Sequence, residues 1–311
     1  MLRSMATVAL ALLAAQAYVP LSSALRLTQV PNAQLHPTND EPFPAPDGRQ
    51  LVIESNRTGK QQLYAISSAG KVLRRITNDG AVDDTPTWSH DGRHIAYLKI
   101  RGTLSWIAIV AAEGGVGRQI AGGDGLDYLH PTWSPDDQWI MYNVNSRRDP
   151  ETYELWAMRP DGSGRRAVTD SGYSETTYGS WSPDGRHIAY RRKFPPYRSQ
   201  IFVANADGTH PRNISNDDAY DGWPSWSPDG RTIVFASNRL ESQRDSLNEA
   251  IFLMAADGSR VRLVTRTSGR NTEPRFAPNG KTVYFSHCIH HECEVFSAAL
   301  DPARSAAARS H

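Results

Sequence analysis

The stretch HCIHHEC, residues 287–293, gathers the residue types from which a metal site or a disulfide could be built. Its cysteines, Cys288 and Cys293, are the only two in the chain. A structural zinc site normally takes four ligands, and Cys-x4-Cys within one hairpin loop is not a standard spacing. The adjacent His290 and His291 would point in opposite directions on an extended segment. We therefore predict a disulfide between the two cysteines in an oxidising compartment, with zinc as the alternative.

Carboxylates concentrate in a set of connecting segments, for example ITNDGAVDDTP and ISNDDAYDGWP. Only Arg266 and Arg270 are basic in these segments. Charge of one sign in a concavity focuses the electric field and attracts a cationic partner or ion. The alternative is that bases in neighbouring loops neutralise the acids in exposed ion pairs of little energetic value. The predicted partner-binding residues are Asp83, Asp84, Asp127, Asp217, Asp218 and Asp221, with Phe194 and Tyr197 from a long loop at 191–200.

The elements that must position these residues come from a phrase that the chain repeats six times, as in PTWSHDGRHIAYLK and PSWSPDGRTIVFAS. Aligned on one position of the turn, successive copies lie 44, 45, 48, 45 and 50 residues apart. Repeats of roughly 40 to 50 residues are typical of propeller blades. The aligned turn residues are Gly48, Gly92, Asp137, Gly185, Gly230 and Gly280. The spacing therefore predicts six blades.

Each repeat contains four strand-like pieces, which the fifth copy illustrates. Pro224–Trp226 is the expected first strand, and Thr232–Ser237, Ala250–Ala255 and Val261–Thr265 follow it. These runs are rich in β-branched and aromatic residues, and Asp-Gly turns separate them. Helix is a poor competitor because Pro or Gly interrupts almost every ten residues. We expect an all-β propeller with four-stranded blades.

The two ends of the chain are expected to complete one blade together. The sixth copy lacks a fourth strand, since its third strand, Glu294–Leu300, runs into DPARSAAARSH. The segment LRLTQ, Leu25–Gln29, matches the fourth-strand segments LRRIT at 73–77 and VRLVT at 261–265. We predict that this N-terminal strand closes the ring as the outer strand of the last blade, which removes an exposed sheet edge.

The N-terminal residues have the layout of a secretory signal peptide, with Arg3, an apolar run from Met5 to Ala15, and then small residues. The run is too short to cross a bilayer comfortably, and an uncleaved anchor is the alternative. We divide the chain into a signal peptide (1–24), a propeller (25–302) and a disordered tail (303–311). The expected location is the periplasm or the outside of the cell, and the expected state is a monomer that does not span the membrane.

The charge balance bears on the class of partner. The chain has 34 Lys and Arg against 33 Asp and Glu. Binding to a polyanion needs a clear excess of basic residues on one face. We therefore expect no nucleic acid as a partner.

The repeated phrase P-x-W-S-P-D-G-x-x-I-x-F, followed by Ser-Asn-Arg, resembles the TolB-type, WD40-like (PD40) propeller repeat. The matching stretches include Pro224–Phe235 with Ser237–Arg239, and Ser55–Arg57 in the first copy. The resemblance covers about residues 25–302, and it implies a propeller and export. TolB has a further α/β domain before its propeller. We expect that domain to be lacking here, because the first repeat follows the predicted signal peptide almost directly.

Two recurrent features are expected to be structural. Large rings at the end of the first strand are expected to pack between neighbouring blades. These rings are Trp88, Trp133, Trp181, Trp226 and Phe276. Turn chemistry alone explains the Asp-Gly pairs that follow them, so we assign no reaction there.

We expect no catalytic residue, metal or cofactor. The chain has no G-x-S-x-G motif of a serine hydrolase. His130 in the third repeat and His287 in the sixth would lie on opposite sides of a ring, so they do not promise a compact ligand set. We predict a non-enzymatic scaffold that binds a protein or peptide. The binding face is formed by two sets of loops: those that lead from the fourth strand of one blade to the first strand of the next, and those between the second and third strands of a blade. The alternatives are a secreted glycan-active lyase with a channel metal, and an ion or small-molecule sensor.

Overall fold

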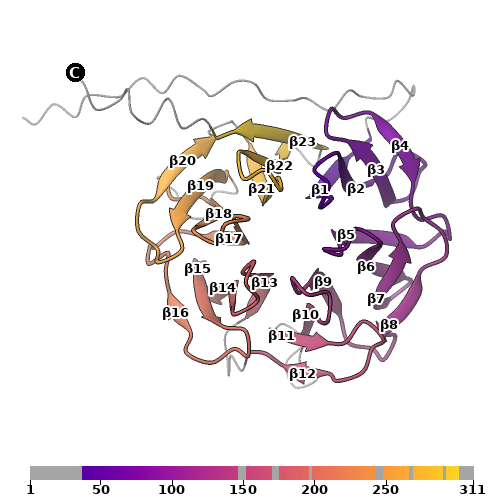
Figure 1. The fold of residues 1–311 in the computed structure, drawn as a ribbon, viewed down its shortest axis with the longest axis horizontal. Helices are drawn as coiled ribbons and strands as arrows, with labels where there is room; N and C mark the ends of the chain where they lie inside the picture. Colours follow the sequence, from indigo (N-terminus) through magenta and orange to yellow (C-terminus); the bar gives the residue numbers. More distant parts are fainter. Residues whose placement is uncertain are drawn as a thin grey trace, which may run out of the picture.

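The computed structural model describes residues 37–145, 152–169, 175–195, 198–241, 248–265, 269–289 and 292–300 (Figure 1). Within these residues the secondary structure consists of strands β1 to β23, with no helix. None of the described residues therefore belongs to a helix that could cross a membrane. The strands form six antiparallel sheets around a central axis. The predicted six-bladed all-β propeller is confirmed.

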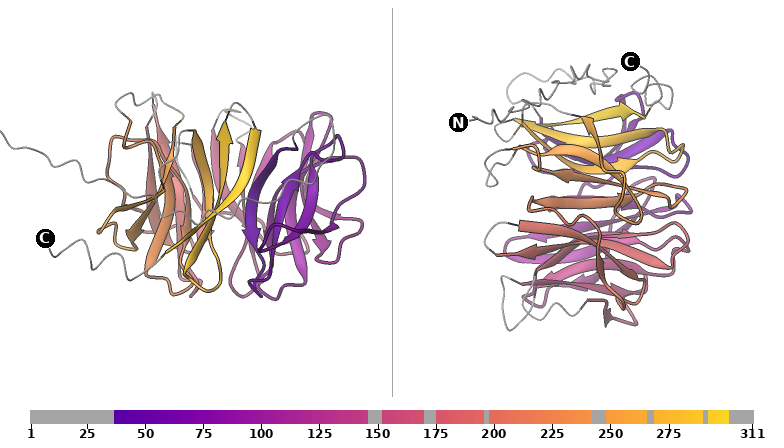
Figure 2. Two further views of the ribbon diagram at one scale, coloured as in Figure 1. Left: turned by 90° about the horizontal axis from the view of Figure 1, so that it is seen from above. Right: turned by 90° about the vertical axis from the view of Figure 1, so that its left-hand side faces the viewer.

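The strands of each blade follow one another in sequence, from the channel outward (Figures 1 and 2). Blades one to three are β1(Asn39–Pro44), β2(Gln50–Ser55), β3(Gln62–Ser67), β4(Val72–Arg75); β5(Val82–Trp88), β6(His94–Arg101), β7(Leu104–Ala111), β8(Arg118–Gly122); and β9(Tyr128–Trp133), β10(Ile140–Asn145), β11(Tyr153–Met158), β12(Arg166–Ala167). Blades four to six are β13(Thr176–Trp181), β14(His187–Phe194), β15(Arg198–Asn205), β16(Arg212–Asn213); β17(Asp221–Trp226), β18(Thr232–Ser237), β19(Ala250–Ala255), β20(Arg262–Thr265); and β21(Arg270–Phe276), β22(Thr282–Ile289), β23(Glu292–Ala299).

Blade six has three described strands, whereas the other five blades have four. Strand β1 of blade one packs against β22 and β23, so the ring of blades is continuous. The predicted closing strand Leu25–Gln29 lies outside the described residues, as do the predicted signal peptide and the tail. Closure by the N-terminal strand therefore stays a prediction.

The hydrophobic core is divided among the seams between neighbouring blades. In the seam between blades one and two, Trp88 packs with Leu63 and Ala65 on one side and with Ile95 and Tyr97 on the other. The equivalent tryptophans of blades three and four are also buried, at no more than 9% exposure. Packing between blades is thus confirmed for this aromatic position, because burying a large ring removes much apolar area from water.

The turns that follow the innermost strands of blades two to five share one hydrogen-bond pattern. In blade two, Ser89 Oγ donates to Asp91 Oδ1 at 2.6 Å, and the Arg93 amide donates to the same oxygen at 2.9 Å. These hydrogen bonds help to hold the pKa of Asp91 below its usual value, although partial burial opposes the shift. The turn glycine follows at positive φ, 71° at Gly92. The recurrent Asp-Gly is therefore a structural device, as the sequence predicted.

The innermost strand of blade five begins earlier than the sequence predicted. In blade five, β17 starts at Asp221 rather than at Pro224. Asp83 and Asp84 likewise lie within strand β5. Acidic residues that the sequence assigned to connecting loops are therefore part of the sheet, where some of them are fully buried. The physical reason is a β-bulge, which lets the strand continue past a break in its register.

Candidate functional site

Each blade places one residue at a β-bulge of its innermost strand. The pairing register with the next strand shifts at this point in all six blades. The bulge residues adopt the left-handed region, with φ between 47° and 57°. A bulge re-aims the side chain and is often found beside functional sites. The bulge residues, which we call the channel ring, are Glu41, Thr85, His130, Tyr178, Trp223 and Glu273.

Carboxyl groups gather on the side of the channel formed by blades one, two and six. The carboxylate oxygens of Glu41, Glu54 and Asp84 lie within 4.8 Å of one another. Glu54 comes from β2, so the group joins the first two strands of blade one to β5 of blade two. We call the whole set the carboxylate cluster, which consists of Asp40, Glu41, Glu54, Asp84 and Glu273.

Backbone amides and an amide side chain hold Glu54 and Asp84 together. The Thr85 amide donates to Asp84 Oδ1 at 2.6 Å and to Glu54 Oε2 at 3.3 Å. Gln61 Nε2 donates to Glu54 Oε1. The carboxylate oxygens of the two residues lie within 4.8 Å of each other, and burial followed by the negative charge of Asp84 raises the pKa of Glu54.

A second carboxyl pair lies where blade one meets blade six. Asp40 and Glu273 lie close enough for each carboxyl group to affect the pKa of the other. Ser286 Oγ donates to Glu273 Oε2 at 3.2 Å and accepts a hydrogen bond from the Glu41 amide at 3.1 Å. The seam between the first and last blades is therefore built on polar contacts at its channel end.

Burial raises the pKa of Glu41, Glu54 and Glu273 well above the usual glutamate range. Neighbouring carboxylates raise these pKa values further, because like charges destabilise the ionised form. The guanidinium of Arg275 opposes the shift at Glu41 and Glu273. More carboxyl groups than bases are present, which favours the neutral form of these three glutamates.

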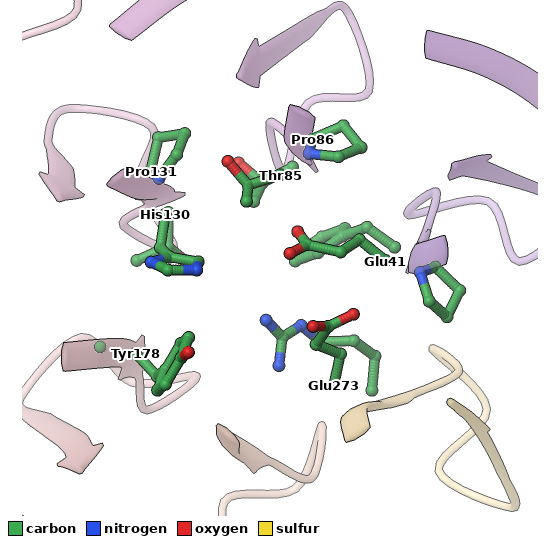
Figure 3. A pocket seen from close by; sticks show the side chains of 13 residues that line it. Glu41, Thr85, Pro86, His130, Pro131, Tyr178 and Glu273 are labelled. Carbon is green, nitrogen blue, oxygen red and sulfur yellow. The ribbon is translucent and has the colours of Figure 1, made fainter. Parts of the chain in front are cut away.

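Five residues of the channel ring, all except Trp223, line a cavity of about 20 Å³ (Figure 3). That volume suits one water molecule or one ion. Glu41, Thr85 and His130 point into it from three successive blades. Thr85 Oγ1 and His130 Nδ1 are buried and have no hydrogen-bond partner among the described residues. Burial, with a smaller effect of Arg191, lowers the pKa of His130 to about 3, so its imidazole is neutral at physiological pH.

The other side of the channel ring is aromatic. The ring of Tyr178 lies 4.5 Å from that of His130 and 4.9 Å from that of Trp223, between centroids. Arg191 lies over Tyr178 at 4.6 Å, and Arg270 lies over Trp223 at 5.1 Å. These are cation–π distances. The channel therefore has an acidic side and a side of aromatic rings capped by arginines.

Toward the turns that follow the innermost strands, the channel widens into a cavity of about 360 Å³, which we call the funnel. Its volume lies within the range of small-molecule and peptide pockets. Phe43 and Arg275 line both the funnel and the small cavity. Aromatic and turn residues from the six blades make up most of the wall, namely Trp88, Trp133, Trp181, Trp226, Phe276, Pro46, His90, Pro135, Pro183, Pro228 and Pro278.

Three of the predicted partner-binding acids are paired with bases inside the protein. Arg239 Nη2 donates to Asp221 Oδ2 at 3.0 Å, and Arg239 Nη1 lies 4.0 Å from Asp217 Oδ2. Asp83 Oδ1 lies 3.9 Å from Lys99 Nζ. Asp83 and Asp221 are fully buried. Neutralisation by neighbouring bases, the alternative interpretation of the sequence, applies to these residues.

Two of the predicted acids are exposed. Asp127 pairs through its amide with Asn145 Oδ1 at 2.8 Å. Asp218 Oδ1 accepts from Arg198 Nη1 at 2.6 Å, yet the Asp218 side chain is 76% exposed. The two residues lie on blades three and five, near the starts of β9 and β17. They remain accessible to a partner.

The remaining predicted residues have different surroundings. Asp84 is a member of the carboxylate cluster. Phe194 is half-buried against Phe202, with 6.2 Å between ring centroids, and so contributes to the core of blade four. Tyr197 lies outside the described residues. The structure therefore does not bring the predicted set together as one patch.

Cys288 and Cys293 form a disulfide across the β22–β23 hairpin, as predicted. Their sulfurs are therefore not available as metal ligands, although Asp40 lies near them. His290 and His291 lie outside the described residues. In the described part of the chain, the remaining group with metal-ligand spacing is Glu41, Glu54 and Asp84.

The sequence analysis missed the channel ring and Glu54. A signal for the ring was present, because the bulge residue stands three positions before the aromatic residue in five repeats and before Pro44 in the first, and a proline directly follows it in five repeats. Comparing the residue at this position in all six repeats would have grouped Glu41, Thr85 and His130. Glu54 carries no such signal, since it lies inside a strand and reaches the cluster only through the packing of blades one and two.

Comparisons with known proteins agree with the fold. The profile of the TolB β-propeller domain (PD40) matches residues 21–194 and 140–304. An uncharacterized protein of Agrobacterium fabrum is 29% identical over 175 residues, which cover 55% of this chain and 53% of that protein. A TolB homolog of Chlorobium chlorochromatii is 27% identical over 150 residues, which cover 46% of this chain and 31% of that protein. The chain thus spans about half or less of the length of these relatives.

Solved structures share the fold at low sequence identity. A candidate TolB from Agrobacterium tumefaciens gives a TM-score of 0.67 at 22% identity, covering 86% of this chain and 92% of its own. TolB from Acinetobacter baumannii gives 0.62 at 16%, covering 85% and 63%. An oligogalacturonate lyase in complex with manganese gives 0.58 at 14%, covering 90% and 98%. At these identities the likeness extends to the fold alone.

Proposed function

The chain belongs to the TolB β-propeller domain family, and from this premise we propose that it is an exported, non-enzymatic scaffold that binds a protein or peptide partner. The funnel is the observation that supports this proposal best. A large, mostly apolar concavity with a few polar groups is the usual form of a binding site. Its wall is made of tryptophan and proline, and tryptophan is enriched among the residues that dominate binding energy.

The funnel suits an extended segment of a partner better than a flat protein surface. It is about 360 Å³ in volume and lies on the axis of the propeller, surrounded by the turns of all six blades. Serine residues of the innermost strands and turns, such as Ser225 and Ser227, line it beside the aromatic rings. We propose that apolar or proline side chains of the partner enter the funnel while its backbone hydrogen-bonds to these hydroxyls.

The opposite face, which the sequence predicted as the binding surface, is a second candidate. Asp127 and Asp218 are exposed there. Their charges would change the rate of association with a basic partner more than the affinity, because exposed charges are screened. Both surfaces are consistent with a scaffold, and a partner could use them together.

The test is photo-crosslinking of the exported protein in its native cell. A photoreactive residue replaces His90 at the rim of the funnel, Asp218 on the opposite face, or Val116, which is 89% exposed and serves as the control. We expect one dominant crosslinked protein from position 90 that position 116 does not give. A crosslink from position 218 instead would move the site to the loop face. Equal products from all three positions, or none, would overturn the scaffold proposal.

A further inference from the structure

The charged side chains in the wall of the funnel are all of one sign. Among the described residues, the wall contains His90 at the rim and Arg275 at the inner end, and no aspartate or glutamate. His90 already faces an acid, because its Nδ1 lies 3.4 Å from Asp137 Oδ1. Arg275 lines both the funnel and the small cavity behind it. The inner end of the funnel is therefore a place for an anion rather than for a cation.

Arg275 differs from other arginines beside the channel, which have an acid of their own. Arg239 pairs with Asp221, and Arg270 pairs with Glu249. Arg275 Nη1 donates to the backbone carbonyl of the preceding residue at 3.2 Å, and its guanidinium makes no other hydrogen bond and no ion pair with the described residues. A guanidinium has five N–H donors, and leaving them unsatisfied in a buried position is costly.

Glu41 and Glu273 lie near Arg275 but on the side of the small cavity. Both line that cavity (Figure 3), and neither lines the funnel. Burial raises the pKa of both glutamates, which favours their neutral forms. Burial lowers the pKa of Arg275 and the two glutamates oppose this shift, but an arginine keeps its charge in proteins. The positive charge of Arg275 is therefore open to an anion that enters from the funnel.

The shape of the funnel indicates which anion. The Arg275 guanidinium carbon lies 5.7 Å from the centre of the Phe43 ring, so the charge adjoins the apolar wall. Behind it the channel narrows from about 360 Å³ to about 20 Å³, which leaves no room for a polypeptide to continue. A segment that enters must end or reverse its direction there. A chain terminus ends without a reversal, and its carboxylate follows directly on the last side chain.

We propose that Arg275 binds the C-terminal carboxylate of the partner, while the last apolar side chains of that partner lie against the aromatic wall of the funnel. Guanidinium and carboxylate pair through two parallel hydrogen bonds, which are stronger in a concavity that excludes water. Capture of a terminal carboxylate is a general mode of peptide recognition. This inference rests on the proposed role of the funnel as the partner site, and it specifies which part of the partner enters.

The test is selection of short random peptides on the exported, oxidised protein, from one library with free C-termini and one with C-terminal amides. We expect enrichment of free acids, and each selected peptide should lose about tenfold or more in affinity as its amide, the loss expected for a hydrogen bond to a charged group. Calorimetry measures both forms.

Three variants locate the carboxylate. Arg275→Met should remove the preference for acid over amide, and Arg275→Lys should keep part of it because lysine retains the charge but not the planar fork. Arg93→Met, in which an arginine with an 80% exposed side chain outside the funnel wall is replaced, is the control and should behave as the wild type. Near-ultraviolet circular dichroism checks that each variant is folded.

Several results would overturn the inference. Equal affinity for acid and amide in the wild type would exclude the terminal carboxylate, and a preference that persists in folded Arg275→Met would place it elsewhere. Enrichment from neither library would exclude a peptide terminus, and binding of trigalacturonate in its place would assign the funnel to an acidic glycan. Photo-crosslinking from position 90 does not require a terminal carboxylate. A crosslinked partner together with equal acid and amide binding would therefore retain the scaffold and overturn this inference alone.

Discussion

At the scale of single residues, the propeller keeps an unusual density of carboxyl groups beside its channel. Glu41, Glu54 and Glu273 all have a raised pKa because burial disfavours their ionised forms. A carboxyl whose pKa is higher in the folded than in the unfolded state stabilises the fold below about pH 4.5. That contribution is lost as the pH rises through the raised value. Unless a cation is bound, this cluster therefore destabilises the protein at neutral and alkaline pH.

The variant Glu54→Gln tests whether ionisation of this carboxyl group lowers the stability as the pH rises. The glutamine is close in shape to a protonated glutamate, but it cannot ionise. At pH 8 we expect Glu54→Gln to be more stable than the wild type, because burial raises the pKa of Glu54 and the glutamine has no charge to bury. At pH 5 the difference should shrink. Urea unfolding at the two pH values measures it.

Asp218→Asn is the matched control, because that exposed carboxylate has no such burial. Equal loss of stability from pH 5 to pH 8 in Glu54→Gln and in the wild type would contradict the prediction.

Sequence reasoning reached some of these residues and not others. The acidic character of the segments before each blade was visible in the composition, and Asp84 was predicted from it. Burial was not visible, because Asp83 and Asp221 look like loop residues until the bulge is known to extend the strand. Ion pairs such as Asp221–Arg239 join positions 18 residues apart and depend on where the hairpin turns.

At the scale of elements, the turns after the innermost strands form contacts from blade to blade. Blade three has Asp137 where five blades have glycine, and its φ is 55°. Its carboxylate accepts hydrogen bonds from the amides of His90 at 2.7 Å and Asp91 at 2.8 Å, in the turn of blade two. The substitution of glycine by aspartate thus adds an inter-blade contact at the rim of the funnel. The repeat alignment located this exception, but only the structure shows its partner.

Asp137→Gly and Asp137→Ala separate the two roles of this residue. Both remove the charge-assisted hydrogen bonds, which we expect to cost about 1–3 kcal/mol in free energy of unfolding. Alanine should cost more than glycine, by up to about 1 kcal/mol, because the positive φ is unfavourable for a residue with a Cβ. Denaturant unfolding of the three proteins gives the order. If glycine were the more destabilising substitution, backbone strain would not matter at this turn.

At the scale of the whole molecule, the repeat predicted the architecture with high fidelity. Strands β18 and β19 have the predicted limits, and β20 differs from its prediction by one residue. The repeat spacing and the turn residues are local signals. Each recurs in six copies, so an irregular copy does not change the assignment. The funnel and the carboxylate cluster are not local, because the funnel needs residues from all six blades and the cluster needs residues from blades one, two and six. That is why the fold could be predicted and the site could not.

Ring closure is the remaining whole-molecule prediction. Strand β23 is the outermost described strand of blade six, whereas each other blade has a fourth strand at this place. An unpaired outer edge would invite pairing with other chains. Leu27→Pro removes a backbone donor in the predicted closing strand and should lower the stability by about 3 kcal/mol and promote aggregation. Thermal unfolding and light scattering measure the two effects. Ala306→Pro in the predicted tail is the control and should change neither, and a neutral Leu27→Pro would show that the strand does not close the ring.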